Sequence, residues 1–282
     1  MRSKPVSLSF AAGFAVVVLG LTTPAHAQLR AVRVAIGEPL LDADAPLWAK
    51  APAADVTMMP QTVTTPMNPA PAILMLHVRA AHDGQQLAVR IDWDDPTRSD
   101  RIVVDQFGDQ VAVQFPEDIT KGVPAPMMGN PGGRVRILQW RAAFQADLEH
   151  GRPNTTRDIY PNALVDVYPD EVLRATDARP YMGAVGMANP ITYADRSPVL
   201  EQIAEGWGTL TVDKSQQADG RGAWKDGHWQ VVITHPLAAG RDDMTLSPGG
   251  MTMAGFAVWD GGSREVGPRK AWAPWVPVQL DP

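Results

Sequence analysis

The chain has 282 residues, no cysteine and a formal net charge of −6. The lack of cysteine excludes disulfides, thiolate metal sites, iron–sulfur clusters and the covalent attachment of a c-type haem. The acidic balance argues against nucleic acid as a partner, because an acidic surface repels a phosphate backbone.

The first 27 residues have the features of a secretory signal. Arg2 and Lys4 precede an apolar run from Phe10 to Leu21, and Ala25-His26-Ala27 supplies an Ala-x-Ala cleavage site. This run of about a dozen residues is too short for a membrane-spanning helix, which needs about 20. We therefore expect export to the periplasm, cleavage after Ala27 and no membrane anchor. Residues 28–282 then form a single domain of 255 residues (282 less 27) with a net charge of −8.

Hydrophobic residues recur mostly at every second position, which is the period of a β-strand. The expected strands are Ile73–Arg79, Gln86–Trp93, Asp109–Phe115, Arg134–Trp140, Gly208–Val212, Gly227–Thr234, Ala254–Trp259 and Trp275–Leu280. The turn His82-Asp83-Gly84 joins the first two as a hairpin. Short helices are expected over Ala142–Leu148 and Val199–Glu205, the second capped by Ser197 and Pro198.

This pattern predicts an all-β fold, an antiparallel β-sandwich of the immunoglobulin-like or carbohydrate-binding-module-like kind, with long loops and one or two short helices. The segment from His150 to Glu205 breaks the β rhythm and is rich in Pro, Tyr, Asp and Arg. A connection of this length inside a compact domain is usually functional.

Histidines and acidic residues give no clear metal motif. The histidines after residue 27 lack metal-binding spacing; they are His77, His82, His150, His228 and His235. A haem with two histidine ligands therefore has no positive support. The acidic groups Asp92–Asp95 and Asp242-Asp243 suit turn capping, and calcium binding at the first group is the alternative.

Two segments contain unusual candidate metal ligands. Met127 and Met128 lie in a loop rich in Pro and Gly, Pro124–Gly133. Their side chains either fold back on the core or present a thioether to a metal such as haem iron. Lys270 lies between two aromatic-rich strands. It is either a solvated lysine after a turn or a buried amine whose lowered pKa leaves it neutral and able to bind a metal.

At these residues the sequence resembles the haem b (gamma) subunits of periplasmic molybdenum enzymes of the dimethyl-sulfoxide-reductase type, which include ethylbenzene dehydrogenase, dimethyl-sulfide dehydrogenase, chlorate reductase and selenate reductase. The matching pieces keep their order along the chain: Asp44–Trp48, Arg90–Thr97, Asp109–Pro116, Met128-Gly129 with Trp140–Ala142, Phe256–Gly261, Arg269-Lys270 and Pro274-Trp275.

The resemblance implies one non-covalent haem b in a β-sandwich, with Met128 and Lys270 as axial ligands of the iron and Met127 as the alternative to Met128. It also implies a non-catalytic subunit that relays electrons between an iron–sulfur beta subunit, which is joined to a molybdenum alpha subunit, and a soluble carrier such as a c-type cytochrome. Arg141 and Arg269 are candidates for contact with the haem propionates.

Two other functions stay open at this point. One is a stand-alone haem b protein with the same site. The other is a cofactor-free β-sandwich that binds a carbohydrate or another small ligand, with Trp224 and Trp229 as stacking platforms.

Overall fold

The computed structural model describes residues 28–101, 106–120, 122–151, 162, 175, 197–238 and 246–282. Within these ranges strands predominate, with one α-helix and one 3-10 helix. The elements are β1 (Leu29–Arg33), η1 (Pro46–Ala49), β2 (Ala54–Thr57), β3 (Met59–Pro60), β4 (Met75–His82), β5 (Gln86–Asp94), β6 (Gln110–Pro116), β7 (Val135–Arg141), α1 (Ala142–His150), β8 (Val199–Ala204), β9 (Thr211–Val212), β10 (Asp219–Lys225), β11 (His228–Pro236), β12 (Met251–Trp259), β13 (Ala271–Trp272) and β14 (Val276–Leu280).

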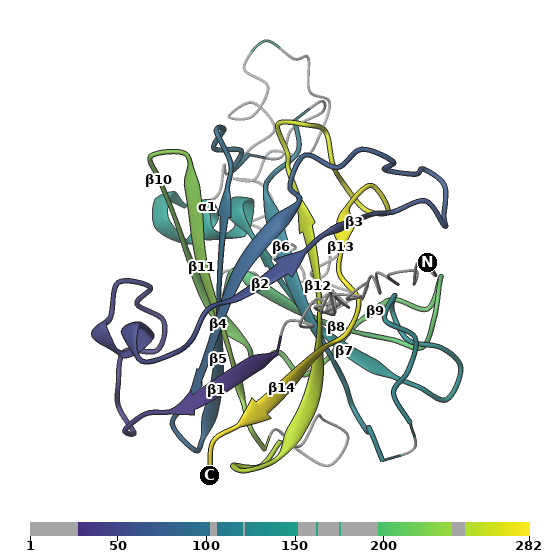
Figure 1. Ribbon diagram of the computed structural model, residues 1–282. Coiled ribbons are helices and arrows are strands. Elements are labelled where there is room, and N and C mark those ends of the chain that lie inside the picture. The colour runs from purple at the N-terminus through teal and green to yellow at the C-terminus, as the bar shows by residue number, and fades with distance from the viewer. Residues whose placement is uncertain are drawn as a thin grey trace, which may run out of the picture.

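The strands form one hydrogen-bonded path that folds into two facing layers (Figure 1). Its order is β10-β11-β5-β4-β1-β14-β12-β6-β7-β8-β9. Strand β12 belongs to both layers, because Met251–Ala254 pairs with β14 and Gly255–Trp259 pairs with β6. Pairing is antiparallel except at β1, which runs parallel to both β4 and β14. The architecture is therefore an all-β sandwich, as the sequence predicts.

Three tryptophans fill the space between the layers. Trp93 of β5 and Trp229 of β11 stack with ring centroids 6.2 Å apart, and Trp140 of β7 meets Trp229 edge-on at 5.0 Å. All three are buried. The neighbouring strand β10 has Gly222 at this point, and a Cβ there would lie 2.2 Å from the Trp140 ring. The glycine therefore makes room for the indole.

Most of the expected strands and helices are present, and the prediction of one helix is wrong. The hairpin of β4 and β5 is confirmed, as are β6, β7, β11, β12, β14 and helix α1. Val199–Glu205 was expected as a helix, but Val199–Ala204 is strand β8, paired with β7 from Val199↔Trp140 to Ala204↔Val135. Pairing with a buried strand outweighs the weak helix signal at Ser197 and Pro198. The signal segment, Asp242-Asp243 and most of the His150–Glu205 connection lie outside the described residues.

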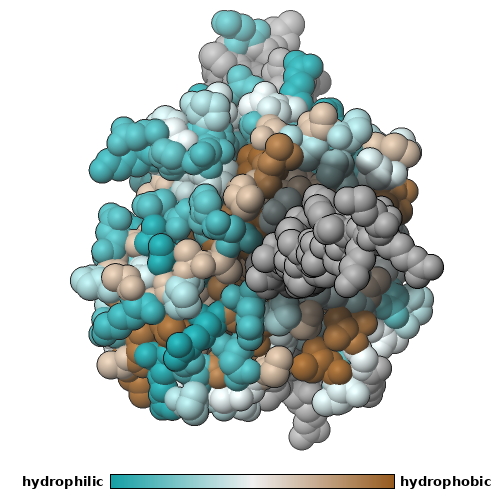
Figure 2. Space-filling model, in the orientation of Figure 1, coloured by the Kyte–Doolittle hydropathy of each residue, from teal (hydrophilic) through white to brown (hydrophobic). Residues whose placement is uncertain are grey.

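On the face shown in Figure 2, hydrophobic residues occur in separate groups among hydrophilic ones. Among the described residues, no helix has the length and apolar character needed to cross a membrane.

Candidate functional site

The site lies on the outer face of the layer that contains β12, β6 and β7, and this face forms the floor of the site. Strands β12, β6 and β7 place their side chains in cross-strand rows because alternate residues point to opposite faces of a sheet. One row is Trp259, Gln110 and Arg141. The next row contains Ala257 and Ala112, followed by Gln139, so the middle of the floor carries only methyl groups on two adjacent strands. The opposite faces of the same strands supply core residues.

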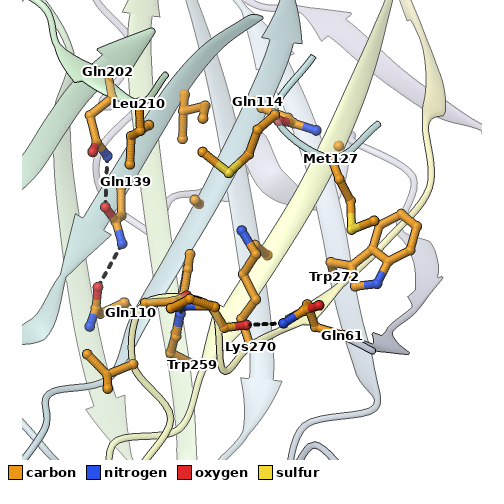
Figure 3. Close-up of a pocket in the computed structure, with 18 of the residues that line it drawn as sticks. Gln61, Gln110, Gln114, Met127, Gln139, Gln202, Leu210, Trp259, Lys270 and Trp272 are labelled. Carbon is orange, nitrogen blue, oxygen red and sulfur yellow. Dashed lines mark hydrogen bonds between the residues drawn. The ribbon is translucent and has the colours of Figure 1, made fainter. Parts of the chain in front are cut away.

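Loops cover this floor and enclose a cavity of about 510 Å³ (Figure 3). The covering segments come from distant parts of the chain, and they include Gln61, the Pro126–Met128 turn, Trp207 and the stretch from Val266 to Lys270. The cavity is open on one side and its wall is mainly apolar. An apolar cavity with a few convergent polar groups is the usual form of a cofactor site.

Glutamines supply much of the polar wall. Gln202 donates to Gln139 at 2.8 Å, and Gln139 donates to Gln110 at 2.7 Å, so the three amides form a chain across β8, β7 and β6 (Figure 3). Gln114 donates to the carbonyl of Pro126 and so ties the floor to the methionine loop. Gly255 leaves space for this contact, because a Cβ there would lie 2.6 Å from the Gln114 amide nitrogen.

The methionine loop has a fixed and unusual backbone. Met128 has φ = 65° and Gly129 has φ = 73°, two consecutive left-handed residues. The Met128 carbonyl accepts a hydrogen bond from Gly206 N at 2.7 Å. A Cβ on Gly129 would lie 2.3 Å from the Gly133 carbonyl oxygen, so only glycine fits at this position. A non-glycine residue held at positive φ is uncommon and often marks a functional site.

Lys270 extends into the same cavity from another covering segment, the stretch from Val266 to Lys270. Its Nζ lies 5.3 Å from the centroid of the Trp259 ring, and Figure 3 shows the side chain pointing into the space between Gln139 and Met127. Burial lowers the pKa of Lys270 to about 8, since an ammonium is poorly solvated there. The structure therefore brings Met127, Met128 and Lys270 together around one cavity.

Arg141 is a second cation in the wall. Its Nη2 donates to Gln139 at 3.0 Å, and its guanidinium lies 5.1 Å from the Phe144 ring centroid. Its Nε is buried without a hydrogen-bond partner, and burial lowers the pKa of this guanidinium. Such a group suits an anionic ligand. Arg269, the other arginine expected near propionates, does not line the cavity.

Other sequence candidates lie elsewhere. None of the five described histidines lines the cavity, and Nδ1 of His77 and of His228 each lie 2.6 Å from an aspartate. The expectation that Trp224 and Trp229 are exposed stacking platforms is wrong. Trp229 is a core residue, and Trp224 packs against the core while donating to the Asp95 carbonyl.

Sequence reasoning missed the glutamine wall. Gln110 and Gln114 alternate with buried apolar residues along β6, which reads as an ordinary strand with one solvated face. Only the register of β6, β7 and β8 shows that these amides meet inside a cavity.

Fold and cavity together define a β-sandwich with a candidate ligand cavity on one sheet face. The ethylbenzene dehydrogenase family model matches residues 45–271, so the chain belongs to that family. The gamma-subunit resemblance seen in the sequence is thereby confirmed.

Relatives with assigned names agree. The chain is 26% identical over 272 residues to the chlorate reductase subunit gamma of Ideonella dechloratans, covering 94% of this chain and 90% of the relative. It is 24% identical to a putative respiratory nitrate reductase heme subunit of Haloferax mediterranei, covering 95% of this chain and 80% of that one. One of these relatives is thus named as the gamma subunit of a reductase and the other as a heme subunit of a reductase.

A solved structure also resembles it at low identity. This is a family 9 carbohydrate-binding module from Caldicellulosiruptor kristjanssonii in complex with glucose, with 10% identity and a TM-score of 0.43, covering 89% of this chain and 95% of that chain.

Proposed function

We propose that residues 28–282 form a single-domain periplasmic b-type cytochrome, exported by a signal that is cleaved after Ala27. It binds one non-covalent haem in the cavity, with the Met128 sulfur and the neutral Lys270 amine as axial ligands. The observation that carries this proposal is the convergence of a thioether loop and a desolvated amine on one apolar cavity.

The residues present fit this group. Methionine and a neutral nitrogen ligand suit haem iron, and methionine ligation tends to raise its reduction potential. The buried, unpartnered Nε of Arg141 suits a propionate carboxylate. The small floor residues Ala112 and Ala257 leave room for a flat ring. Without cysteine the haem cannot be attached through thioethers, which excludes c-type haem and is consistent with the proposed b-type.

Met128 is favoured over Met127 as the sulfur ligand. Met128 is the residue held at positive φ, with its carbonyl fixed by Gly206. Met127 also lines the cavity, and its thioether is drawn next to the Trp272 indole in the view of Figure 3.

When bound, the haem supplies one-electron oxidation and reduction. The chain's own residues would hold it, with Lys270 and Met128 supplying the nitrogen and sulfur ligands of the iron. Trp207 and Val266 of the covering loops line the cavity, and the degree of solvent exclusion around a haem is one way a protein sets its reduction potential. The proposed role is to relay electrons between an iron–sulfur subunit, joined to a molybdenum subunit, and a soluble carrier such as a c-type cytochrome.

The test is an absorption spectrum of the purified haem-loaded protein and its variants. Wild type is expected to show a low-spin spectrum, and Met128→Ala and Lys270→Ala should each change it. Met127→Ala is the matched control for the loop, and Lys225→Ala, at an exposed lysine, is the control for the amine. A low-spin spectrum that survives Met128→Ala and Lys270→Ala together would exclude these ligands.

Partnership is tested separately. An affinity-tagged chain, expressed in its native periplasm, is expected to co-purify with subunits that contain molybdenum and iron–sulfur clusters. Recovery of the haem protein alone would favour the stand-alone cytochrome.

A further inference from the structure

A second group of chemically active side chains lies beside the cavity but outside it. Asp95 follows β5, Asp109 precedes β6 and Asp260 follows β12. One carboxylate oxygen from each lies within 4.8 Å of the other two. All three residues are buried, with relative exposures of 1%, 0% and 7%. Three carboxylates are thus held together away from water.

Their hydrogen bonds come from neutral donors that favour the ionised form. Asp109 accepts from Ser99 N at 2.7 Å, from Gly261 N at 2.9 Å and from Trp229 Nε1 at 3.0 Å. Asp260 accepts from the backbone N–H and the hydroxyl of Ser263. Among the described residues, no Lys, Arg or His forms an ion pair with any of the three carboxylates.

One oxygen of the cluster lacks a donor. Asp95 Oδ1 accepts from the N–H and the hydroxyl of Thr97, each at 3.0 Å. Asp95 Oδ2 is buried and forms no hydrogen bond of normal geometry, and neither does the indole Nε1 of Trp93. Burial raises the pKa of Asp95, and this indole still offsets part of that rise. Thr97 thus occupies Oδ1, and Oδ2 is the oxygen of Asp95 that accepts no hydrogen bond. An orphaned carboxylate oxygen beside two other carboxylates is the atom that a cation would bind.

The surrounding backbone leaves space at this point. A Cβ on Gly262 would lie 2.6 Å from Thr97 Oγ1 and 3.1 Å from Asp260 Oδ1. A side chain there would press on the cluster, so the glycine keeps it open. Burial, and then the negative charge of Asp95, raise the pKa of Asp109 to about 7, so the ionised form of this carboxyl is unfavourable without a counterion.

We propose that Asp95, Asp109 and Asp260 bind one Ca²⁺ ion. The ligand atoms are all carboxylate oxygens, which suit a hard cation, while the absence of His and Cys from the cluster disfavours zinc and copper. Three ligands from three separate segments suit the irregular coordination of Ca²⁺ better than the strict octahedron of Mg²⁺. Backbone carbonyls and water complete such sites.

A bound Ca²⁺ ion would connect the large cavity to the protein core. Asp109 is bonded to cavity residues Gly108 and Gln110 on either side, and Asp260 directly follows Trp259 of the cavity floor. Bound Ca²⁺ would therefore fix one end of the cavity floor, where β6 begins and β12 ends, relative to the turn that follows β5. The cluster contains none of the proposed haem ligands, so its test is independent of the haem proposal.

The test is calorimetric titration of CaCl2 into the full chain after treatment with a chelator, together with the midpoint of thermal unfolding. The expected result is saturable binding of one Ca²⁺ per chain and a raised midpoint, with weaker binding of MgCl2. Asp95→Asn should weaken Ca²⁺ binding at least tenfold. Asp94→Asn is the matched control, because Asp94 is exposed and pairs with His228 outside the cluster, and it should leave binding unchanged.

The absence of saturable binding and of any shift in the midpoint would overturn the proposal, and it would mean that only a proton or a water fills the site. Equal Ca²⁺ affinity in Asp95→Asn and wild type would also overturn it. If Asp95→Asn fails to fold, Asp260→Asn replaces it and is judged by the same tenfold criterion.

Discussion

The haem affinity of this chain is expected to depend on pH through Lys270. Burial places the pKa of this amine at about 8 instead of 10.5. Below pH 8 the haem-free protein therefore carries a proton on Nζ, which must leave before the nitrogen can bind iron. Binding is then coupled to the release of one proton.

The size of the effect follows from this linkage. With one proton released per haem, the dissociation constant should fall about tenfold for each pH unit between 6 and 8, about 100-fold in all. Above pH 8 the amine is already neutral, and the affinity should level off. The assay is fluorescence quenching of the tryptophans during titration of the haem-free chain with haemin from pH 6 to pH 9.

Lys270→Met is the matched control, because a thioether also binds haem iron but does not titrate. Its affinity should be nearly independent of pH across the same range. If wild type shows no change between pH 6 and 8, or if Lys270→Met shows the same slope as wild type, Lys270 is not the nitrogen ligand.

Three further variants test the fold around the site. Gly222→Ala should cost about 1–3 kcal/mol by overpacking against Trp140, and Trp140→Phe in the same chain should reduce that loss; equal losses in both backgrounds, measured by thermal unfolding, would contradict the steric explanation. Gly129→Ala should shift the ligand loop, because its Cβ meets the Gly133 carbonyl; the expected readout is a changed haem spectrum, and an unchanged one would show that the loop tolerates the methyl group. Glu201→Gln should cost on the order of 3 kcal/mol at neutral pH, since it removes one partner of a buried ion pair. Burial raises the pKa of Glu201, but the hydrogen bond with His235 and those from backbone N–H groups outweigh it and leave the pKa below its ordinary value of 4.5. The contribution of this carboxylate is therefore present above pH 4.5 and is lost as the pH falls through the lowered pKa of the folded state; denaturant unfolding should show the two proteins converging in acid.

Much of the fold is predictable from local pattern, and the exceptions have physical causes. Alternation of apolar and polar residues identifies β5, β6 and β7 because each buries one face. Strand β10 is hidden because Gly220 and Gly222 resemble a loop, whereas these glycines are required by Trp140. Strand β1 is hidden because its partners, β4 and β14, are distant in sequence.

The residues of the site likewise fall into those that the local sequence identifies and those that only the tertiary structure brings together. Met127, Met128 and Lys270 stand out because thioethers in a polar loop and a lysine among aromatic residues are locally unusual. The group Asp92–Asp95 was expected as a unit, but the alternation of side chains along β5 separates its members. Asp92 pairs with Arg90, Asp94 pairs with His228, and Asp95 alone is buried. Its neighbours Asp109 and Asp260 lie at the ends of β6 and β12, which only the tertiary structure brings close to the turn after β5.

The amide chain of Gln202, Gln139 and Gln110 has one more consequence. Carboxamides neither gain nor lose protons near neutrality, and here each is oriented by the next. The cavity wall therefore presents fixed dipoles whose field is the same in mild acid and mild base. Proton uptake or release that accompanies reduction of a centre in this cavity therefore cannot arise at these three amides.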